Sequence, residues 1–253
     1  MKEEILVTIV TPCYNSEKTI ATTIEAVLNQ TYKKLEYIIV DGASTDHTLE
    51  IIEEYRKQFE EKGIRLKVIS EPDKGIYDAM NKGIKEATGE IIGIINSDDW
   101  YETQAVCRMV ETYEKSSFDM FYADLQIWAE DESGDWKKKM VKHSRLRKLA
   151  VSRDWNHPTT FITKKVYENY RYKLESIHDD WDLVLRIRKA GLKIVVLNEV
   201  LANFRMGGAS NEKDISKCIE RGKARYQIYR NNGYSRWYIF ECVFIEVIKW
   251  VMG

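Results

Sequence analysis

The chain has 253 residues, 44% of them hydrophobic and 31% charged, which is ordinary for a globular protein with one large core or two small domains. The 39 Lys and Arg residues balance 40 Asp and Glu residues, so no overall basic field indicates a nucleic-acid partner. The four cysteines form no CxxC pair, which favours buried thiols in a reducing compartment over a disulfide framework or a zinc site. We find no signal-peptide pattern and no run of about 18 apolar residues, so we expect a cytoplasmic protein without a membrane-spanning helix.

Strand and helix patterns alternate through the first hundred residues. Apolar runs predict strands at residues 6–11, 35–40, 66–69 and 91–95, and helical periodicity predicts helices at 18–29, 48–59 and 76–87. Asn15 or Ser16 is the expected N-cap of the first helix. The alternation predicts βαβ units and an α/β fold, with a mostly parallel central sheet flanked by helices. Right-handed crossovers then bring the carboxyl ends of all four strands to one edge.

The second half is less regular and ends in a long helical tail. We expect helices at residues 104–115 and 182–190, and strands at 120–128, 159–162, 194–197 and 200–204. Residues 137–148 hold seven Lys and Arg side chains and no acid. They are consistent either with contact to an anionic lipid diphosphate or with a solvated strand edge.

The segment 91–100 carries the clearest chemical signal. Four isoleucines within five residues predict a buried parallel strand, and Asp98 and Asp99 follow it closely. Chemistry in open α/β sheets gathers at the carboxyl ends of strands. Carboxylates there suit a hard cation such as Mg²⁺ or Mn²⁺, which is held by one or two carboxylates and by substrate phosphates. We therefore expect metal-assisted handling of a nucleoside diphosphate, and consider a simple polar turn before Trp100 the weaker interpretation.

Short motifs in the following order resemble family 2 of the inverting glycosyltransferases, which have the GT-A fold. In the first half they are TPCYN at 11–15, VDGASTD at 40–46, DKGIYDAMN at 73–81 and NSDD at 96–99. In the second half they are HPTTF at 157–161, DDWDL at 179–183 and the segment 204–210. Each motif alone is weak, but their order and spacing together are a strong signal. The resemblance is greatest with small bacterial enzymes that build surface polysaccharides.

This resemblance implies a set of donor-binding residues along the sheet edge. It implies that Asp41 accepts a hydrogen bond from a uracil imide, and that Lys74 and Arg205 balance the charge of a diphosphate. A turn aspartate before Gly42 and a polar turn at Lys74 are the alternative interpretations. The expected donor-binding residues are Thr11, Pro12, Tyr14, Asp41, Asp73, Lys74, Asp78, Asp98 and Arg205.

The resemblance also implies how the chemistry is divided. It gives direct metal coordination to Asp99, and the ribose or the water shell of the metal to Asp98, with Mn²⁺ or Mg²⁺ as the cofactor. Asp180 matches the catalytic base, which takes the proton of the acceptor hydroxyl while the sugar C1 is attacked opposite the diphosphate. The expected acceptor-facing residues are His157, Asp179 and Trp181. The alternatives are that these aspartates only favour a helix N-terminus and that the histidine belongs to the core.

Residues 237–253 combine aromatic and branched apolar side chains with few charges. On a helical wheel Glu241, Glu246 and Lys249 share one arc, and apolar residues fill the rest. A basic stretch precedes this segment, since residues 213–236 hold seven Lys and Arg against two acids. The pattern predicts an interfacial amphipathic helix and peripheral contact with the inner face of the cytoplasmic membrane. A helix that covers the domain and a homodimer contact are the alternatives.

By this resemblance the chain is one GT-A domain with a nucleotide-sugar-binding half at residues 1–100, an acceptor-binding half at 101–210 and a helical tail at 211–253. We predict a metal-dependent inverting glycosyltransferase that moves a sugar from a UDP-linked or other nucleoside-diphosphate donor to a glycan or polyprenyl-linked acceptor. One alternative is a polyprenyl-phosphate glycosyltransferase, whose phosphate acceptor needs no strong base. The other is a non-catalytic sugar-nucleotide-binding module.

Overall fold

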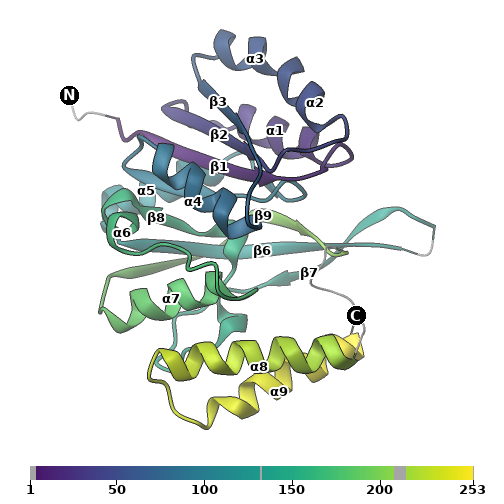
Figure 1. Cartoon of the computed structure of the whole chain (residues 1–253). Helices are drawn as coiled ribbons and strands as arrows, with labels where there is room; N and C mark the ends of the chain where they lie inside the picture. Colours follow the sequence, from purple (N-terminus) through teal and green to yellow (C-terminus); the bar gives the residue numbers. More distant parts are fainter. Residues whose placement is uncertain (1–3, 132, 208–214, 253) are drawn as a thin grey trace.

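The computed structural model describes residues 4–131, 133–207 and 215–252 (Figure 1). Its strands are β1 (Val7–Cys13), β2 (Leu35–Asp41), β3 (Arg65–Ser70), β4 (Ile91–Ile94), β5 (Trp100–Tyr101), β6 (Met120–Glu130), β7 (Trp136–Lys142), β8 (Phe161–Thr163) and β9 (Ile194–Arg205). Its α-helices are α1 (Ile20–Leu28), α2 (Thr48–Glu54), α3 (Arg56–Glu61), α4 (Ile76–Glu86), α5 (Ala105–Lys115), α6 (Lys164–Asn169), α7 (Asp179–Lys189), α8 (Ile215–Asn231) and α9 (Tyr238–Met252). Two short 3₁₀ helices, η1 (Ser152–Asp154) and η2 (His157–Thr159), precede β8.

One sheet runs through both halves of the chain, in the order β3-β2-β1-β4-β8-β6-β9-β5, with β7 paired to β6 beside this path. The pairs β2–β3, β1–β2 and β1–β4 are parallel, as the alternating sequence pattern predicts. β8 joins β4 and β6 in antiparallel pairs, while β6 and β9 run parallel. The register sets Cys13 opposite Asp41 and Asp41 opposite Ser70, so three strands end level at one edge.

Strand alternation distributes the core over both faces of this sheet. Val7 and Ile9 of β1 pack with α1, α2, α3 and α5 on one face. Val10 points to the opposite face and belongs to a second core cluster, which also contains side chains of α4, α6, α7 and the α8–α9 hairpin. Figure 1 shows this hairpin on the far side of the molecule from α2 and α3. Burial on both faces explains why β1, β2 and β4 are mostly apolar.

Two expectations about the first half are wrong in detail. The predicted helix at 48–59 is divided into α2 and α3 at Tyr55, whose N–H bonds to the Ile52 carbonyl three residues back at 3.2 Å. Neither Asn15 nor Ser16 caps α1, which begins at Ile20 after Thr19. Asn15 instead adopts a left-handed backbone conformation, with φ of 48°, and its side chain accepts the Thr45 N–H at 2.9 Å. It therefore connects the loop after β1 to the loop after β2.

The second half differs from prediction in how its segments join. The two strands predicted at 194–197 and 200–204 form the single strand β9, which is irregular where it passes Asp124 of β6. Helix α7 begins at Asp179, three residues earlier than predicted, so all three acids of the DDWD motif lie in its first turn. In the part of the chain that the structure describes, no helix is both long and apolar enough to cross a membrane.

Candidate active site

Asp41 ends β2 and is completely buried. Its carboxylate accepts hydrogen bonds from the Ser44 N–H at 3.0 Å, from the Ser44 hydroxyl, and from the Ser70 hydroxyl at 2.7 Å. The Cys13 thiol lies 3.8 Å away and, because of its burial and the nearby carboxylate, has a raised pKa. These bonds fix the loop after β2 against β1 and β3, so Asp41 shapes the floor of this edge.

Gly42 follows Asp41 directly and lies close against the side chains of Asp73 and Tyr14. A Cβ atom at this position would lie 2.5 Å from Asp73 Oδ2 and 3.4 Å from the Tyr14 ring. Tyr14 is 62% exposed, although it sits beside these polar groups. Asp73 is held by the Gly75 N–H, which donates to its Oδ1 at 2.7 Å. Tyr14, Gly42 and Asp73 therefore lie close together at this edge, where the exposed ring of Tyr14 is available to a ligand.

The other donor-side residues are less directly placed. Thr11 and Pro12 are buried in β1, and the Thr11 hydroxyl accepts from Tyr37 at 3.0 Å, so this side chain is turned into the core. The Lys74 side chain is exposed, and its backbone N–H donates to Asp78 Oδ2 at 3.0 Å. Asp78 also lies 3.6 Å from Lys82 Nζ. Lys74 and Asp78 thus shape the loop after β3, whereas Thr11 and Pro12 belong to the core strand β1.

Asp98 and Asp99 lie in the turn between β4 and β5, where the sequence predicts them. Asp99 is completely buried, and its backbone carbonyl accepts the Thr23 hydroxyl at 2.6 Å. Its Oδ1 accepts the Arg205 N–H at 3.3 Å, whereas its Oδ2 is buried without a hydrogen-bond partner among the described residues. Burial, and then the charge of Asp98, raise the pKa of Asp99 well above its usual range. Burial also raises the pKa of Asp98.

A buried carboxylate oxygen without a partner is costly unless something satisfies it. Hard oxygen ligands of this kind fit Mg²⁺ or Mn²⁺. Within the described ranges, no group of three or more His, Cys, Asp or Glu side chains gathers as a metal site. The pair fits an ion that takes its remaining ligands from substrate phosphates and water, as Mg²⁺ usually does.

Arg205 comes to the same place from the end of β9. Its guanidinium lies over the Trp100 ring at 5.1 Å and the Trp136 ring at 5.5 Å. It also donates to the Thr22 hydroxyl at 3.3 Å, and its Nε is buried without a partner in the described part of the chain. The two aromatic rings hold the Arg205 guanidinium beside Asp98 and Asp99, where it can bind an anionic group of a ligand. Gly207 follows with φ of 127°, and residues 208–210 of this motif lie outside the described residues.

Asp180 stands in the first turn of α7, half-buried. Its Oδ1 accepts the Trp181 N–H at 2.7 Å. Burial raises the pKa of Asp180, against the opposing influence of His157, the Trp181 N–H and the Tyr77 hydroxyl. The Tyr77 hydroxyl also donates to the Ile177 carbonyl at 2.9 Å. The residue thus has the properties of a general base, since a raised pKa increases the proton affinity of a carboxylate.

Aromatic side chains surround this carboxylate. Tyr77 and Tyr172 stack with ring centroids 5.2 Å apart, and His157 Nε2 lies 3.4 Å from the Tyr172 hydroxyl. His157 packs edge-on against Trp155 at 5.8 Å. Burial lowers the pKa of His157, although the charge of Asp180 opposes this. His157 is therefore a neutral imidazole at pH 7 that borders the base.

The remaining two acceptor-side residues lie within the domain. Asp179 is buried, and its Oδ2 accepts the Glu175 N–H at 2.7 Å, which closes the loop before α7. Trp181 is 3% exposed and lies 5.8 Å from the Trp155 ring and 6.1 Å from the Tyr229 ring. Both side chains point into the domain and anchor the first turn of α7 there.

The predicted residues therefore gather in three groups, around Asp41, around Asp99 and around Asp180. A hydrogen bond between the Ser16 and Ser97 hydroxyls, 2.8 Å long, joins the loop after β1 to the loop of Asp99. Tyr77, at the start of α4, links the loop after β3 to Asp180. Sequence reasoning missed Ser44, Ser70 and Tyr172. Ser44 lies inside a recognised motif, but Tyr172 belongs to an irregular loop whose spacing carries no signal.

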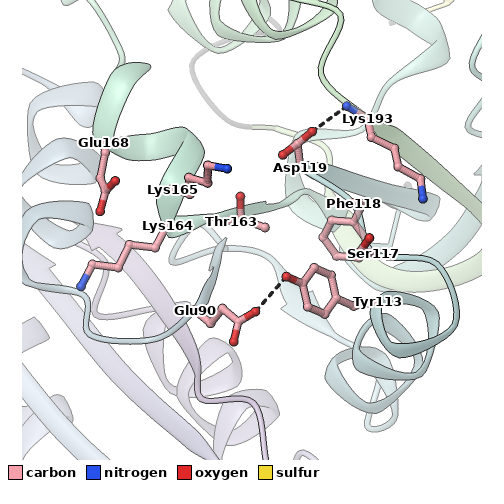
Figure 2. Close-up of a pocket in the computed structure, with 10 residues that line it drawn as sticks. All are labelled: Glu90, Tyr113, Ser117, Phe118, Asp119, Thr163, Lys164, Lys165, Glu168 and Lys193. Carbon is pink, nitrogen blue, oxygen red and sulfur yellow. Dashed lines mark hydrogen bonds between the residues drawn. The ribbon is translucent and has the colours of Figure 1, made fainter.

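A separate hollow of about 460 Å³ lies away from these groups (Figure 2). It opens near the start of β4 and α6, where Glu90 accepts the Tyr113 hydroxyl at 2.8 Å and Asp119 accepts the Lys193 N–H at 2.7 Å. Both carboxylates are thus engaged by the protein, and charges of both signs line the hollow. None of the predicted site residues lines this hollow, so it is not part of the candidate active site.

The fold is of the GT-A type, because solved GT-A proteins match nearly the whole chain. Staphylococcus aureus TarS, solved in complex with UDP-GlcNAc, covers 97% of this chain and 72% of its own at a TM-score of 0.68 and 17% identity. The mannosyltransferase PcManGT from Pyrobaculum calidifontis, solved with GDP-Man and Mn²⁺, covers 97% of this chain and 70% of its own at 0.70 and 16%. At such identities the likeness concerns the fold alone.

The chain belongs to glycosyl transferase family 2, whose family model matches residues 8–175. Glycosyltransferase GlyA of Streptococcus pneumoniae is 22% identical over 251 residues, which cover 90% of this chain. The same alignment spans only 35% of GlyA, so the chain corresponds to about a third of that relative. The predictions of the family and of the GT-A fold class are confirmed.

Proposed function

We propose that the protein is a metal-dependent inverting glycosyltransferase that uses a nucleoside-diphosphate sugar, with UDP as the nucleotide. The observation that carries this proposal is the Oδ2 atom of Asp99, buried and without a partner among the described residues at the carboxyl edge of the sheet. Such an atom is costly in a finished fold and becomes favourable when a cation occupies the turn. The nucleotide-sugar and Mn²⁺ complexes of the two structural neighbours agree with this proposal.

In the proposed reaction the donor lies along the carboxyl ends of β1 to β4. Tyr14 and Asp73 border the nucleoside, Asp41 supports the floor beneath it, and Arg205 meets the diphosphate. Mn²⁺ or Mg²⁺, held by Asp99 with Asp98, would neutralise charge on the departing diphosphate. The first hundred residues form the donor half, and residues 101–210 form the acceptor half.

Asp180 acts on the other substrate. It takes the proton of the acceptor hydroxyl as the hydroxyl oxygen bonds to the sugar C1, and the bond from C1 to the diphosphate oxygen breaks on the opposite face. One displacement inverts the anomeric configuration and needs no covalent enzyme intermediate. Tyr77 and His157, both half-buried, border the base and can contact a sugar ring, while the buried Tyr172 supports Tyr77 from behind.

The acceptor in this proposal is a glycan hydroxyl, presented on a polyprenyl-linked glycan at the inner face of the cytoplasmic membrane. We place the reaction in the synthesis of surface polysaccharides, which is the role that the sequence resemblance implies. The placement of a carboxylate at Asp180, beside Tyr77 and His157, supports a hydroxyl acceptor, because a lipid phosphate is already ionised and needs no base.

Donor binding is tested by thermal unfolding of the purified protein with a panel of UDP- and GDP-sugars, each with and without Mn²⁺. A ligand that binds only the folded state at 100 times its Kd adds about 2.7 kcal/mol of stability. We expect one donor to raise the unfolding temperature, the effect to require the cation, and Asp99→Asn to remove it. An equal rise in the presence of excess EDTA would contradict the metal assignment.

A further inference from the structure

Helix α9 is oriented with its acidic side against the protein. Glu241 accepts hydrogen bonds from the Ser152 N–H at 3.2 Å and from the Ser152 hydroxyl at 3.1 Å. Glu246 is buried and pairs with Arg225 at 2.8 Å and with Arg221 at 3.1 Å, both on α8. Glu241 and Glu246, two members of the polar arc found in the sequence, therefore face the domain.

The apolar side of α9 faces outward as a consequence. Six large apolar side chains on it, including the residue just before the helix, are between 52% and 66% exposed. They are Trp237, Phe240, Val243, Phe244, Val247 and Trp250. Their spacing of three and four residues makes one continuous stripe along the helix. We call these six residues the α9 stripe.

Contacts with the domain fix this orientation. The Tyr238 hydroxyl accepts the Ala150 N–H at 3.1 Å, and Cys242 and Ile245 are buried beneath the helix. Rotation of the helix about its axis would leave the buried charges of Glu246 and Arg225 without partners, which is strongly unfavourable. The exposure of the α9 stripe is thus a built-in property of the fold.

Basic residues border the α9 stripe. The Arg153 guanidinium lies over the Phe244 ring at 4.9 Å, and Arg236 lies over the Trp237 ring at 5.9 Å. The segment 145–149, sequence RLRKL, is exposed throughout and leads directly into the Ala150 and Ser152 contacts with α9. Apolar side chains with arginine at their border, and tryptophan at each end, have the composition of a membrane-surface helix.

We propose that the α9 stripe, with its basic border, docks the protein on an anionic lipid bilayer with α9 parallel to the membrane plane. The helix has 15 residues and is about 22 Å long, too short to span a bilayer core of about 30 Å. Its apolar stripe suits the acyl boundary and its arginines suit lipid phosphates. The proposal deepens the proposed function, on which it rests for a lipid-linked acceptor.

A second copy of the chain fits this surface less well. Self-association would bring the bordering arginines of two copies into the same contact. Both acidic residues of α9, Glu241 and Glu246, are already engaged inside each copy and cannot pair with those arginines. An anionic bilayer supplies the missing negative charge, because its lipid headgroups can move to meet the arginines wherever they lie.

The test is co-sedimentation of the full chain with vesicles of 70% phosphatidylcholine and 30% phosphatidylglycerol, compared with pure phosphatidylcholine. Two matched pairs of variants are compared. Phe240→Ser removes an exposed apolar side chain of the α9 stripe, and Met140→Ser removes one that is 47% exposed on β7. Arg153→Glu and Lys57→Glu each change the net charge by two units, and Lys57 lies on α3, far from the hairpin (Figure 1).

We expect binding to the anionic vesicles that weakens in high salt. Phe240→Ser should lower the partition coefficient about tenfold, because transfer of a phenylalanine side chain out of water favours binding by about this factor. Arg153→Glu should lower it about 10- to 30-fold. Met140→Ser and Lys57→Glu should leave it within about twofold, as expected for surface changes outside the contact.

Three results would overturn the proposal. They are no sedimentation of the intact chain with anionic vesicles, equal losses in each variant and its matched control, and a dimer in analytical ultracentrifugation that Phe240→Ser dissociates while vesicle binding is absent. The last result would assign the stripe to a second copy of the chain. The vesicle assay contains no donor and therefore does not depend on the proposed activity. Thermal unfolding of the same protein samples with and without a donor tests the proposed function separately.

Discussion

Replacing Asp180 by Asn separates the chemistry of this side chain from its structural role. The amide oxygen of the new asparagine can still accept the Trp181 N–H, which the Asp180 carboxylate accepts at 2.7 Å, so the start of α7 should be retained. Burial raises the pKa of Asp180, which means that the folded protein disfavours the charged form. A neutral amide should therefore leave the unfolding temperature unchanged or raise it slightly.

Transfer, by contrast, should fall by about 10²- to 10⁴-fold, because the acceptor proton has lost its base. This corresponds to about 3–5 kcal/mol of activation free energy. The assay measures nucleoside-diphosphate release with a saturating acceptor and, separately, donor affinity by calorimetry. Donor affinity should change less than twofold, since Asp180 belongs to the acceptor side of the proposed site.

Asp182, two residues along the same helix turn, is the matched control. Although burial opposes it, hydrogen bonds from Asn232 and Arg186 hold the pKa of Asp182 below its usual range. Asp182→Asn should therefore lower stability by about 2 kcal/mol through weakened charged contacts, with little change in transfer per folded molecule. Full transfer by Asp180→Asn would refute the base assignment and favour a phosphate acceptor that needs none.

Three further outcomes follow from the geometry. Asp99→Asn should abolish cation-dependent donor binding without lowering the unfolding temperature, because the buried Oδ2 of Asp99 has no partner to lose among the described residues; calorimetric titration with and without Mn²⁺ checks this. Gly42→Ala should weaken donor binding about tenfold or more, because the new Cβ would lie 2.5 Å from Asp73 Oδ2 and force that carboxylate to move; unchanged affinity would separate Asp73 from the donor site. The pH profile of transfer should lose activity as pH falls through the raised pKa of Asp180, at a pH above the value of about 3.9 for an unperturbed aspartate; the residual rate of Asp180→Asn should lack this contribution and keep only the loss that comes from protonation of Asp98 and Asp99.

The sequence predicted the residues that follow regular elements. Asp41, Asp98 and Asp99 could be placed because an apolar strand precedes each turn, and parallel strands end at a common edge. Asp180 could be placed because its motif opens a helix. In each case local periodicity shows which strand end or helix start carries the residue. The topology of a parallel sheet then shows which other loops lie beside it.

Contacts between irregular segments could not be predicted. Tyr172 reaches the base from a loop without periodicity, and only tertiary packing brings its ring onto Tyr77. The helical wheel of α9 separated Glu246 from the apolar residues correctly but could not show which side meets the protein. That orientation depends on the ion pairs of Glu246 with Arg221 and Arg225. These residues are 21 or more positions from Glu246, and no spacing rule pairs them.

The most direct test of the central claim is the release of nucleoside diphosphate by the purified chain from a panel of UDP- and GDP-sugars, with water or a simple glycoside as the acceptor. We predict measurable release from at least one donor with Mn²⁺ or Mg²⁺, its loss in excess EDTA, and its loss in Asp99→Asn while that variant stays folded. No release from any donor, together with no donor-induced stabilisation, would contradict the account. Release that is equally fast in EDTA and in Asp99→Asn would contradict the role given to the buried carboxylate pair.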